Sequence, residues 1–344
     1  MTAPLPSPDF SWDPVANPPV AGLRPYRDAT FRLEPEQVGA KFVVHNYGHG
    51  GGGITLSWGC ALEVADLVKQ HGFAAGQGVA VLGAGVMGLT VATCLRELGL
   101  AVALYAKAFH PFTTSNVAGG QWAPSMVNQN DQTRFNRILR RAYQTHQAKG
   151  PVFGVSPKIN YTLVHAGNFA SCPPDVIPPP QVFAHLPFAH LTHSGFGYKT
   201  LLVEPPIFLR KMHDDLVAAG VPMITRTFSG LNEVTSLTES IVVNCTGLGS
   251  KQICGDNLMH SVRGQLVKLP PQPQLNWLFA GRHGYVFPRQ DCVVVGGTEE
   301  MDVTDPTPNL AMCETMLANM KSVFAGGIGM MAAAAPPDWL MKSK

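Results

Sequence analysis

Charged residues are scarce in this chain of 344 residues: they make up 14% of it, and 25 Lys and Arg nearly balance 23 Asp and Glu. Because the formal net charge is only +2 and no basic tract occurs, the sequence gives no indication of a nucleic-acid partner or of an anionic membrane surface. Hydrophobic residues reach 45%, so the chain can bury a sizeable core, and extended disorder is not expected.

Paired cysteines and long apolar runs are also missing. The 7 cysteines are scattered without a C-x-x-C pair, which argues against a disulfide framework and against a zinc ribbon. No apolar run is long enough to span a bilayer, and residues 1–12 lack the basic and apolar pattern of a signal peptide. We therefore expect a soluble cytoplasmic protein with reduced, mostly buried thiols and no metal.

Glycine and proline, by contrast, are plentiful, with 35 and 29 residues. This composition suits many short loops around an α/β core, and the length allows one large domain or two intimate ones. The first 20 residues are rich in proline, so we expect a loosely ordered arm there. The Ala/Gly/Pro tail over 325–344 is expected to be a second flexible terminus.

A loop with four consecutive glycines, residues 45–55, follows a strand-like apolar run and leads into a predicted helix. Glycine leaves backbone N–H groups free of Cβ hindrance, so such a loop can approach a ring or an anion closely. Two alternatives remain open: a mobile linker, or a metal site built from His45 and His49. The second lacks a third ligand nearby.

Residues 79–105 give a strand, a G-x-G-x-x-G turn, a helix and a second strand. In this context the first glycine makes the turn, the second admits a pyrophosphate, and the third lets the helix pack on the strand. The sequence therefore predicts a dinucleotide site at residues Gly83, Ala84, Gly85, Val86, Met87 and Gly88.

The second strand of this unit ends in Lys107, where an acidic residue usually binds the ribose hydroxyls. A lysine at this position is compatible with a 2′-phosphate, and so with NADP. It is equally compatible with a solvated charge at a strand end.

A second loop, residues 113–122, carries three hydroxyl residues, then small residues, then a tryptophan. This loop, the G-x-G-x-x-G strand and the H-N-Y-G-H-G-G-G-G loop together resemble the D-amino-acid oxidase family of FAD enzymes, which includes D-aspartate oxidase. The V-N-C-T-G run ending at Gly247, the R-G-Q strand from Arg263 and the G-Y-V-F-P-R run ending at Arg289 are similar to motifs of the same family.

The resemblance implies an FAD-dependent oxidative deamination, with hydride passing from the substrate Cα to flavin N5. Reoxidation by O2 would give H2O2, and the imine would hydrolyse to a 2-oxo acid and ammonia. Arg24, in Gly-Leu-Arg-Pro, matches the arginine that binds the substrate carboxylate. Tyr285 matches a tyrosine that holds the same carboxylate, and Gly51 a glycine whose carbonyl accepts from the substrate amine. The plainer alternatives are a surface turn or inter-strand ion pair for Arg24 and core packing for Tyr285.

By the same resemblance, further residues are expected at the cofactor. They are Gly22, Gly50, Gly53, Ile54, Thr55, Thr113, Thr114, Ser115, Gly120, Gln121, Phe228, Thr246 and Gly247, besides Lys107 and the dinucleotide turn.

The order of these motifs differs from the family. There the nucleotide strand opens the chain, and the arginine strand and the glycine loop close it; here the closing pieces occupy residues 21–69, ahead of Gly83. The sequence therefore resembles a circular permutant, with the old termini joined across residues 69–78.

The predicted fold is α/β: a Rossmann-type FAD-binding domain with an intertwined mixed-sheet substrate domain, in permuted chain order. We expect the first domain in 21–150 and 221–262, including the 41–69 segment. We expect the second in 151–220, 263–324 and 21–40, so that residues 21–40 are assigned to both.

Three functions are kept open. The first is a D-amino-acid oxidase, whose partners would be a small-molecule amino-acid substrate and O2, with a homodimer as one possible assembly. The others are an NADP-linked reductase and a non-catalytic flavin-binding homologue. Arg282 and His283, next to Tyr285, could favour an acidic substrate or could simply be exposed.

Overall fold

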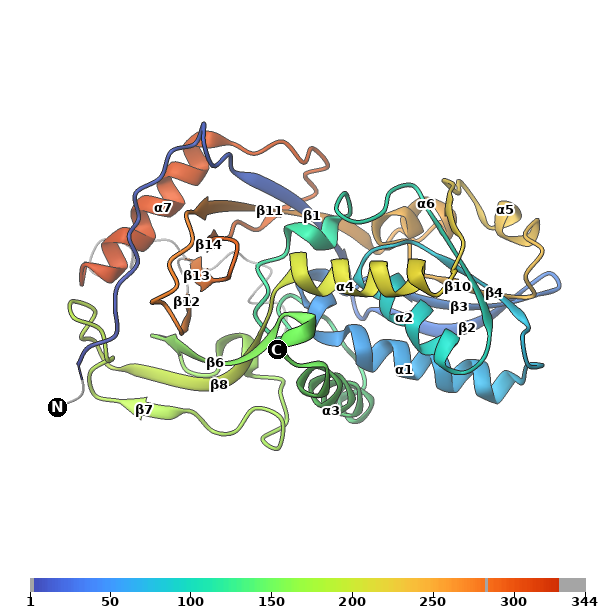
Figure 1. Cartoon of the computed structure of the whole chain (residues 1–344), viewed down its shortest axis with the longest axis horizontal. Coiled ribbons are helices and arrows are strands. Elements are labelled where there is room, and N and C mark those ends of the chain that lie inside the picture. Colours follow the sequence, from blue (N-terminus) through green and yellow to red (C-terminus); the bar gives the residue numbers. More distant parts are fainter. Residues whose placement is uncertain (1–2, 282–283, 328–344) are drawn as a thin grey trace.

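A computed structural model of the protein describes residues 3–281 and 284–327. Within them the chain forms two sheets that lie at opposite ends of an elongated molecule, with helices packed around them (Figure 1). This mixed α/β architecture confirms the predicted fold class. Arg282, His283 and most of the expected C-terminal tail lie outside the described residues.

The first sheet, on the right of Figure 1, has the strand order β2-β3-β10-β4-β5-β9 in the described chain. Adjacent strands in this sheet are parallel, except for the antiparallel β2–β3 hairpin at one edge. The central strands are short apolar runs buried almost completely, as expected of a parallel sheet covered on both faces. The strands are β2 (Arg32–Val38), β3 (Lys41–Tyr47), β4 (Gly78–Leu82), β5 (Ala101–Ala106), β9 (Met223–Thr225) and β10 (Ile241–Asn244).

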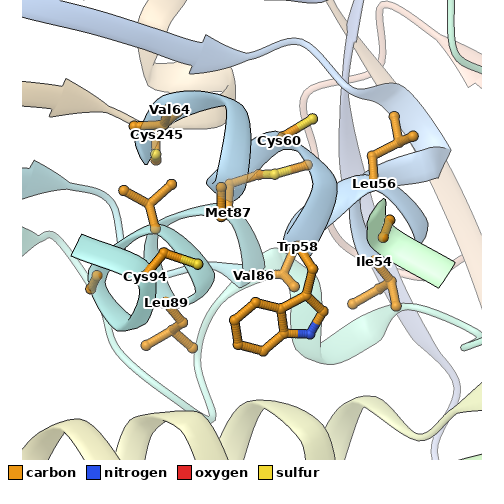
Figure 2. Close-up of a cluster of buried hydrophobic side chains, with 14 of the residues drawn as sticks. Ile54, Leu56, Trp58, Cys60, Val64, Val86, Met87, Leu89, Cys94 and Cys245 are labelled. Atoms are coloured by element: carbon orange, nitrogen blue, oxygen red, sulfur yellow. The ribbon is translucent and has the colours of Figure 1, made fainter. Parts of the chain in front are cut away.

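Helices α1 (Gly53–His71), α2 (Val86–Glu97), α3 (Gln132–Lys149) and α4 (Pro205–Ala218) surround this sheet. Figure 2 shows the apolar contact between α1 and α2, where Trp58 and Leu89 are buried. Helix α3 crosses α1 so closely that a Cβ on Gly59 would collide with the backbone oxygen of Ile138. Two short helices, α5 (Leu231–Thr235) and α6 (Ser250–Ile253), flank β10 in sequence.

The second sheet has the strand order β1-β11-β14-β13-β12-β6-β8-β7, and β15 also pairs with β11. Helix α7 (Leu310–Phe324) packs on it through Met316, Met320 and Phe324. In the described chain no helix is both long and apolar enough to cross a lipid bilayer. The strands are β1 (Val20–Arg27), β6 (Val155–Thr162), β7 (Gln181–Phe183), β8 (Gly195–Val203), β11 (Met259–Leu269), β12 (Leu278–Gly281), β13 (Gly284–Pro288), β14 (Val293–Gly296) and β15 (Glu300–Met301).

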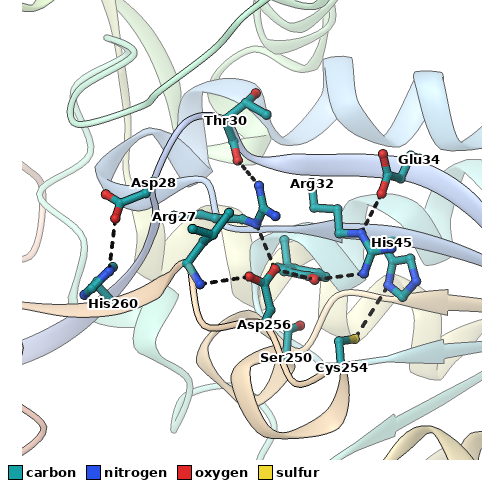
Figure 3. Close-up of polar contacts among 12 residues, drawn as sticks. Arg27, Asp28, Thr30, Arg32, Glu34, His45, Ser250, Cys254, Asp256 and His260 are labelled. Atoms are coloured by element: carbon teal, nitrogen blue, oxygen red, sulfur yellow. Dashed lines mark hydrogen bonds and ion pairs between the residues drawn. The ribbon is translucent and has the colours of Figure 1, made fainter. Parts of the chain in front are cut away.

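The segment 20–71 contributes to both sheets. Strand β1 pairs with β11 in the second sheet, whereas β2 and β3 belong to the first. Residues 21–40, which were predicted in both domains, are thus divided between β1 and β2. Asp256 holds the end of β1 against the end of β3. It accepts a hydrogen bond of 2.8 Å from Arg27 Nε (Figure 3) and another of 2.8 Å from the Tyr47 hydroxyl.

Residues 3–19, expected as a loose arm, instead lie along α7 and the second sheet (Figure 1). Asp9 and Gln272 exchange two hydrogen bonds of 2.8 Å, from Asp9 N to Oε1 and from Nε2 to Asp9 O. The Phe10 ring lies 5.8 Å from that of Phe324. This segment packs because apolar side chains are spaced among its prolines. The proline content alone had suggested a loose arm.

Candidate functional site

Arg24 projects from the middle of β1 onto one face of the second sheet. It stands opposite Val262 of β11, and a Cβ on the neighbouring Gly264 would collide with its guanidinium group. The guanidinium therefore lies across bare backbone, and its Nη1 donates to the Thr298 carbonyl oxygen at 2.9 Å. The surface-turn alternative for Arg24 is wrong, because the residue is part of a paired strand.

Tyr285 of β13 faces the same side of the sheet. Gly296 of β14 lies opposite both Tyr285 and Leu266, which places this tyrosine on the face that carries Gly264 and Arg24. A Cβ built on Gly297 would lie 3.0 Å from the Tyr285 hydroxyl and 3.4 Å from Arg24 Nη2. The two polar tips thus converge on one point, although 261 positions (285 − 24) separate them in the chain.

The surroundings keep Tyr285 in its neutral form. Its ring stacks on Phe287 at 4.2 Å between centroids. Burial raises the pKa of the phenol, and the nearby positive charge of Arg24 opposes the rise. A neutral phenol can donate a hydrogen bond to a carboxylate, so the chemistry of Arg24 and Tyr285 makes this point a candidate carboxylate site.

The glycine loop folds as a short 3-10 turn, Gly50–Gly52, that leads directly into α1. A Cβ on Gly50 would collide with the Met126 carbonyl oxygen, and one on Gly52 with the Val127 side chain. These two glycines are therefore required by packing within the protein. Gly51 is the exposed member, and a Cβ there would lie 3.6 Å from Arg24 Cδ.

The first turn of α1 is largely used by the protein itself. Ile54 is buried in the core, and the Thr55 hydroxyl both donates to Ala123 O at 2.8 Å and accepts from Ala123 N at 3.0 Å. The side chains of Ile54 and Thr55 are thus unavailable to a cofactor. Only backbone groups near Gly53 can meet a ligand in this turn.

The G-x-G-x-x-G turn divides its three glycines between packing and access. A Cβ on Gly83 would collide with the Cys245 carbonyl oxygen, and one on Gly88 with the Gly83 carbonyl oxygen. A Cβ on Gly85 would meet only the Ser115 hydroxyl, at 3.1 Å. The backbone N–H of Val86, the first residue of α2, donates to this hydroxyl at 3.0 Å.

The donors at this turn fit the pyrophosphate of a dinucleotide. The N-terminus of a helix favours anions, and here a hydroxyl oxygen already accepts from its first N–H. An oxygen of a phosphate would find the same donor. Ala84 and Met87 flank this position with buried side chains, so that they face a ligand with their backbone.

The second loop, residues 113–122, lies between the two sheets. Gly22 of β1 fits against it, since a Cβ there would lie 3.1 Å from Val117 Cβ. A Cβ on Gly119 would lie 3.1 Å from the Tyr285 ring. Within the loop the Thr113 hydroxyl donates to the Asn116 side chain at 2.9 Å, while Thr114 is exposed. The loop therefore connects the dinucleotide turn to the tyrosine.

Gln121 offers a further donor at this junction. Its Nε2 is buried and has no hydrogen-bond partner in the described part of the chain. The preceding Gly120 is held tightly, because a Cβ there would lie 2.5 Å from the Val203 carbonyl oxygen. An unpaired buried amide is costly unless a ligand satisfies it, so Gln121 fits a bound cofactor with acceptor atoms.

The remaining predicted residues lie around this centre. Gly247 adopts a positive φ of 56°, and a Cβ there would lie 3.7 Å from Pro25, next to Arg24. The Thr246 hydroxyl donates to the Asn244 side chain at 2.7 Å. Phe228 is buried edge-on against Tyr105, 6.1 Å between ring centroids, so its side chain belongs to the core. Lys107 is exposed just beyond β5.

His45 and His49 do not form a metal site. His45 Nε2 lies 2.8 Å from Glu36 Oε2, and His49 stacks on Phe31 at 4.9 Å. Burial lowers the pKa of His49 to about 3, so it stays neutral. No group of His, Cys, Asp and Glu within residues 3–281 and 284–327 could hold a metal ion.

The sequence did not reveal the turn from Gly297 to Glu299 as part of the site, although the strand before it was predicted. A hollow of about 440 Å³ adjoins Gly297 and Thr298 and is otherwise lined by α7 and by Asn309 at its N-terminus. Helix α7 packs on the Gln265 face of β11, since the Gln265 side chain accepts from Asn309 N. Gly264 and Arg24 face the other way, so we do not assign this hollow to the carboxylate site.

Comparison with known proteins identifies the family of the chain. Residues 78–338, more than half of the chain, match the family model described as FAD dependent oxidoreductase. A D-amino-acid oxidase of Streptomyces coelicolor is 29% identical over 249 residues, which cover 68% of this chain and 74% of the relative. The D-aspartate oxidase of Homo sapiens is 29% identical over 246 residues, which cover 64% and 68%.

Among solved structures, an L-amino acid deaminase from Proteus vulgaris lacking its specific insertion sequence has a similar fold. The TM-score is 0.53 at 16% identity, over 74% of this chain and 76% of that one. The family match, the two-sheet fold and the dinucleotide turn all agree. The chain belongs to the family of FAD dependent oxidoreductases, and FAD is its cofactor.

Proposed function

We propose that this enzyme catalyses the oxidative deamination of D-amino acids. The convergence of Arg24 and Tyr285 on one point, with Gly51 beside the arginine, is the observation that carries the proposal. Support comes from the relatives, which include D-amino-acid oxidases and a D-aspartate oxidase. When bound, FAD accepts two electrons and the hydrogen of the substrate Cα and passes the electrons to O2, giving H2O2.

Each of the three residues has a defined task in this proposal. Arg24 binds the substrate carboxylate through the guanidinium N–H groups that remain after its bond to Thr298, and Tyr285 donates a further hydrogen bond. The Gly51 carbonyl accepts from the substrate amine. The neutral amine needs no further base, and the imine product hydrolyses to a 2-oxo acid and ammonia.

We further propose that the cofactor lies between the two sheets. The backbone of Gly85 and Val86 would hold the pyrophosphate, with the Ser115 hydroxyl beside it. The Gln121 amide and the backbone of Gly50 to Gly53 would meet the ring system. Among the other residues expected at the cofactor, those with buried side chains would bind it through their backbone groups alone.

The chain order is proposed to be a circular permutation of the family. In support, the family match begins at residue 78, yet the preceding segment supplies β1 and β3 to the two sheets. The division into an FAD-binding and a substrate domain follows the two sheets, with the boundary of the N-terminal segment between Arg27 and Arg32.

The decisive test is the release of hydrogen peroxide from a panel of D- and L-amino acids, run beside a flavin spectrum of the purified protein. Oxidation restricted to D-isomers is expected. Silence across the panel with FAD bound would favour the non-catalytic flavin protein instead. The family match is to FAD enzymes, so it gives no support to an NADP-linked reductase. Lys107, which suggested NADP, is an exposed side chain beyond the end of β5.

Arg24→Leu tests the carboxylate site directly. Removal of one charge-assisted pair costs roughly 1.5–3 kcal/mol, so KM should rise about 10- to 150-fold with FAD still bound. Arg96→Leu, which removes an exposed arginine at the far end of α2, is the matched control. An unchanged KM in Arg24→Leu would exclude the assigned role.

A further inference from the structure

Glu299 lies directly beside the carboxylate site but has no part in it so far. It follows Thr298, whose carbonyl oxygen accepts from Arg24, and Gly297, which adjoins the Tyr285 hydroxyl. The side chain of the next residue, Glu300, points to the opposite face of the sheet. There it accepts from Arg263 Nη2 at 2.6 Å.

Side chains alternate between the two faces of an extended chain. Glu300 stands opposite Arg263 of β11 and shares its face, whereas Gly264 and Arg24 lie on the other face. The residue before Glu300 is therefore directed to the side of Arg24. Glu299 itself precedes β15 and has no register partner, so its place at the edge of the substrate site follows from this alternation and from the bond between the adjacent Thr298 carbonyl oxygen and Arg24.

The charge of Glu299 acts on this site. Partial desolvation raises the pKa of its carboxyl group, and the positive charge of Arg24 opposes the rise. The negative charge also acts on the phenol of Tyr285. Glu299 remains exposed overall, and it makes no ion pair with any residue that the structure describes.

Glu300, by contrast, is fully used within the protein. Besides the pair with Arg263, it accepts from Gln265 Nε2 at 2.7 Å and from the Thr298 hydroxyl at 2.8 Å. Of the two adjacent acids, only Glu299 can meet a substrate. A substrate side chain that extends from the carboxylate at Arg24 toward this edge of the site would meet the negative charge of Glu299.

We infer that Glu299 makes the enzyme selective for D-amino acids with a cationic side chain and against those with an acidic one. The inference rests on the proposed oxidase function, because Arg24 must hold the α-carboxylate. A side-chain ammonium or guanidinium would be attracted to Glu299, and a side-chain carboxylate would be repelled. Glu299 acts on substrate choice alone and takes no part in the transfer of electrons.

Two substrate pairs isolate the side-chain charge: D-glutamate and D-glutamine are isosteric, and D-norleucine is D-lysine without its side-chain ammonium group. We expect kcat/KM to be higher for D-lysine than for D-norleucine, and higher for D-glutamine than for D-glutamate. In Glu299→Gln the ratio of D-lysine to D-norleucine should fall about tenfold. In Glu299→Arg the ratio of D-glutamate to D-glutamine should rise. Glu314→Gln removes an exposed charge on α7 and is the matched control, expected to leave both ratios unchanged.

Binding of the same pairs is measured in parallel by calorimetry under argon on protein whose bound flavin has been reduced beforehand, so that no hydride can be transferred during the measurement. Equal ratios in the native protein and Glu299→Gln, in both kinetics and binding, would overturn the inference while leaving the oxidase function intact. A protein that oxidises no D-amino acid but still binds D-lysine in preference to D-norleucine would refute the oxidase proposal instead. Absence of both turnover and preferential binding would refute both.

Discussion

At the scale of the residue, glycines shape this site as much as the polar side chains do. Arg24 can lie flat because Gly264 has no side chain, and Tyr285 can reach the same point because Gly296 opposite it is bare. The positions of both polar side chains therefore depend on glycines that have no functional group of their own. The site is defined by space left open on the sheet.

Gly264→Ala tests this directly without changing any polar group. The added Cβ would collide with the Arg24 guanidinium, so the arginine must move away from the position that it now holds. Misplacement of a binding group by about 1 Å costs on the order of 100-fold, so kcat/KM should fall by roughly this factor.

The control is Gly78→Ala at the start of β4, where a Cβ would meet its nearest atom, Glu239 Cγ, at an ordinary 3.4 Å. Its kinetics should match those of the native protein. If Gly264→Ala retained full activity, the flat position of Arg24 would not be the one used in catalysis.

Single residues were predicted where their chemistry is unusual, and missed where it depends on partners. The arginine of the Gly-Leu-Arg-Pro run and the tyrosine of the G-Y-V-F-P-R run could be singled out from the sequence, because both runs resemble motifs of the family. Glu299 could not, because one must know that Glu300 faces Arg263 before the direction of Glu299 follows. The place of Thr55 at the flavin stays a prediction, and the two hydrogen bonds of its hydroxyl to Ala123 appear only in the folded chain.

At the scale of the element, the N-terminus of α2 holds a hydroxyl where a cofactor phosphate is expected. Ser115 accepts from Val86 N, although it lies 29 positions further along the chain. The loop after β5 is thereby tied to the dinucleotide turn. A negative charge at residue 115 should strengthen this hydrogen bond and weaken the binding of the cofactor.

In Ser115→Asp we expect a carboxylate at the helix N-terminus, which stabilises the protein without cofactor by roughly 0.3–1 kcal/mol. The same charge repels the pyrophosphate, so the Kd for FAD should rise more than tenfold. Thermal unfolding of the apoprotein and fluorimetric titration with FAD measure the two effects.

Ser115→Ala serves as the reference, because it removes the hydroxyl and adds no charge. Its apoprotein should be slightly less stable, and its affinity for FAD should change far less. Equal losses of affinity in the two variants would show that the hydroxyl itself, and not the space at the helix terminus, binds the phosphate.

Elements with a strong period were predicted well. The helix from Gln132 and the strands around the G-x-G-x-x-G turn lie within a few residues of their expected positions, because apolar spacing determines them locally. The short strands β7, β12 and β15 were not predicted, since two to four residues carry no period. Their existence depends on longer neighbours with which they pair.

At the scale of the whole molecule, buried neutral histidines make stability depend on pH. Burial lowers the pKa of His49 to about 3 and that of His146 to about 4, both from an ordinary value of 6.5. Below pH 6.5 these two histidines become protonated in the unfolded chain but stay neutral in the folded chain. Stability is therefore complete above this pH and is lost as the pH falls.

Between about pH 6 and 5 each of the two histidines should lower the free energy of unfolding by up to about 1.4 kcal/mol per pH unit. Urea unfolding at half-unit steps of pH measures the slope. In His146→Leu the slope should decrease by one histidine equivalent. The same slope in that variant would mean that other groups dominate the acid response.

The proposed permutation can be reversed by design. Joining residue 327 to residue 3 is favoured by the contact between Phe10 and Phe324, and new termini can open between Gly72 and Gly76, where a Cβ would meet nothing within 4 Å. The rearranged chain should fold and bind FAD as the native one does.

A matched chain opened inside β10, between Val242 and Val243, should fail to fold, because this strand is buried and pairs on both sides. Loss of folding in the chain opened at the 72–76 turn as well would show that its connection is structurally required. Fluorescence of bound flavin and thermal unfolding distinguish these outcomes.

The pairing of β1 with β11 also has a consequence for synthesis on the ribosome. Strand β1 ends at Arg27, and its partner begins at Met259, which is 232 positions later (259 − 27). At roughly 5–20 residues per second, β1 waits about 10–50 s for its neighbour to emerge. During that interval the strand that carries Arg24 has an unpaired edge, so the nascent chain should need protection by chaperones longer than a relative that makes this strand last.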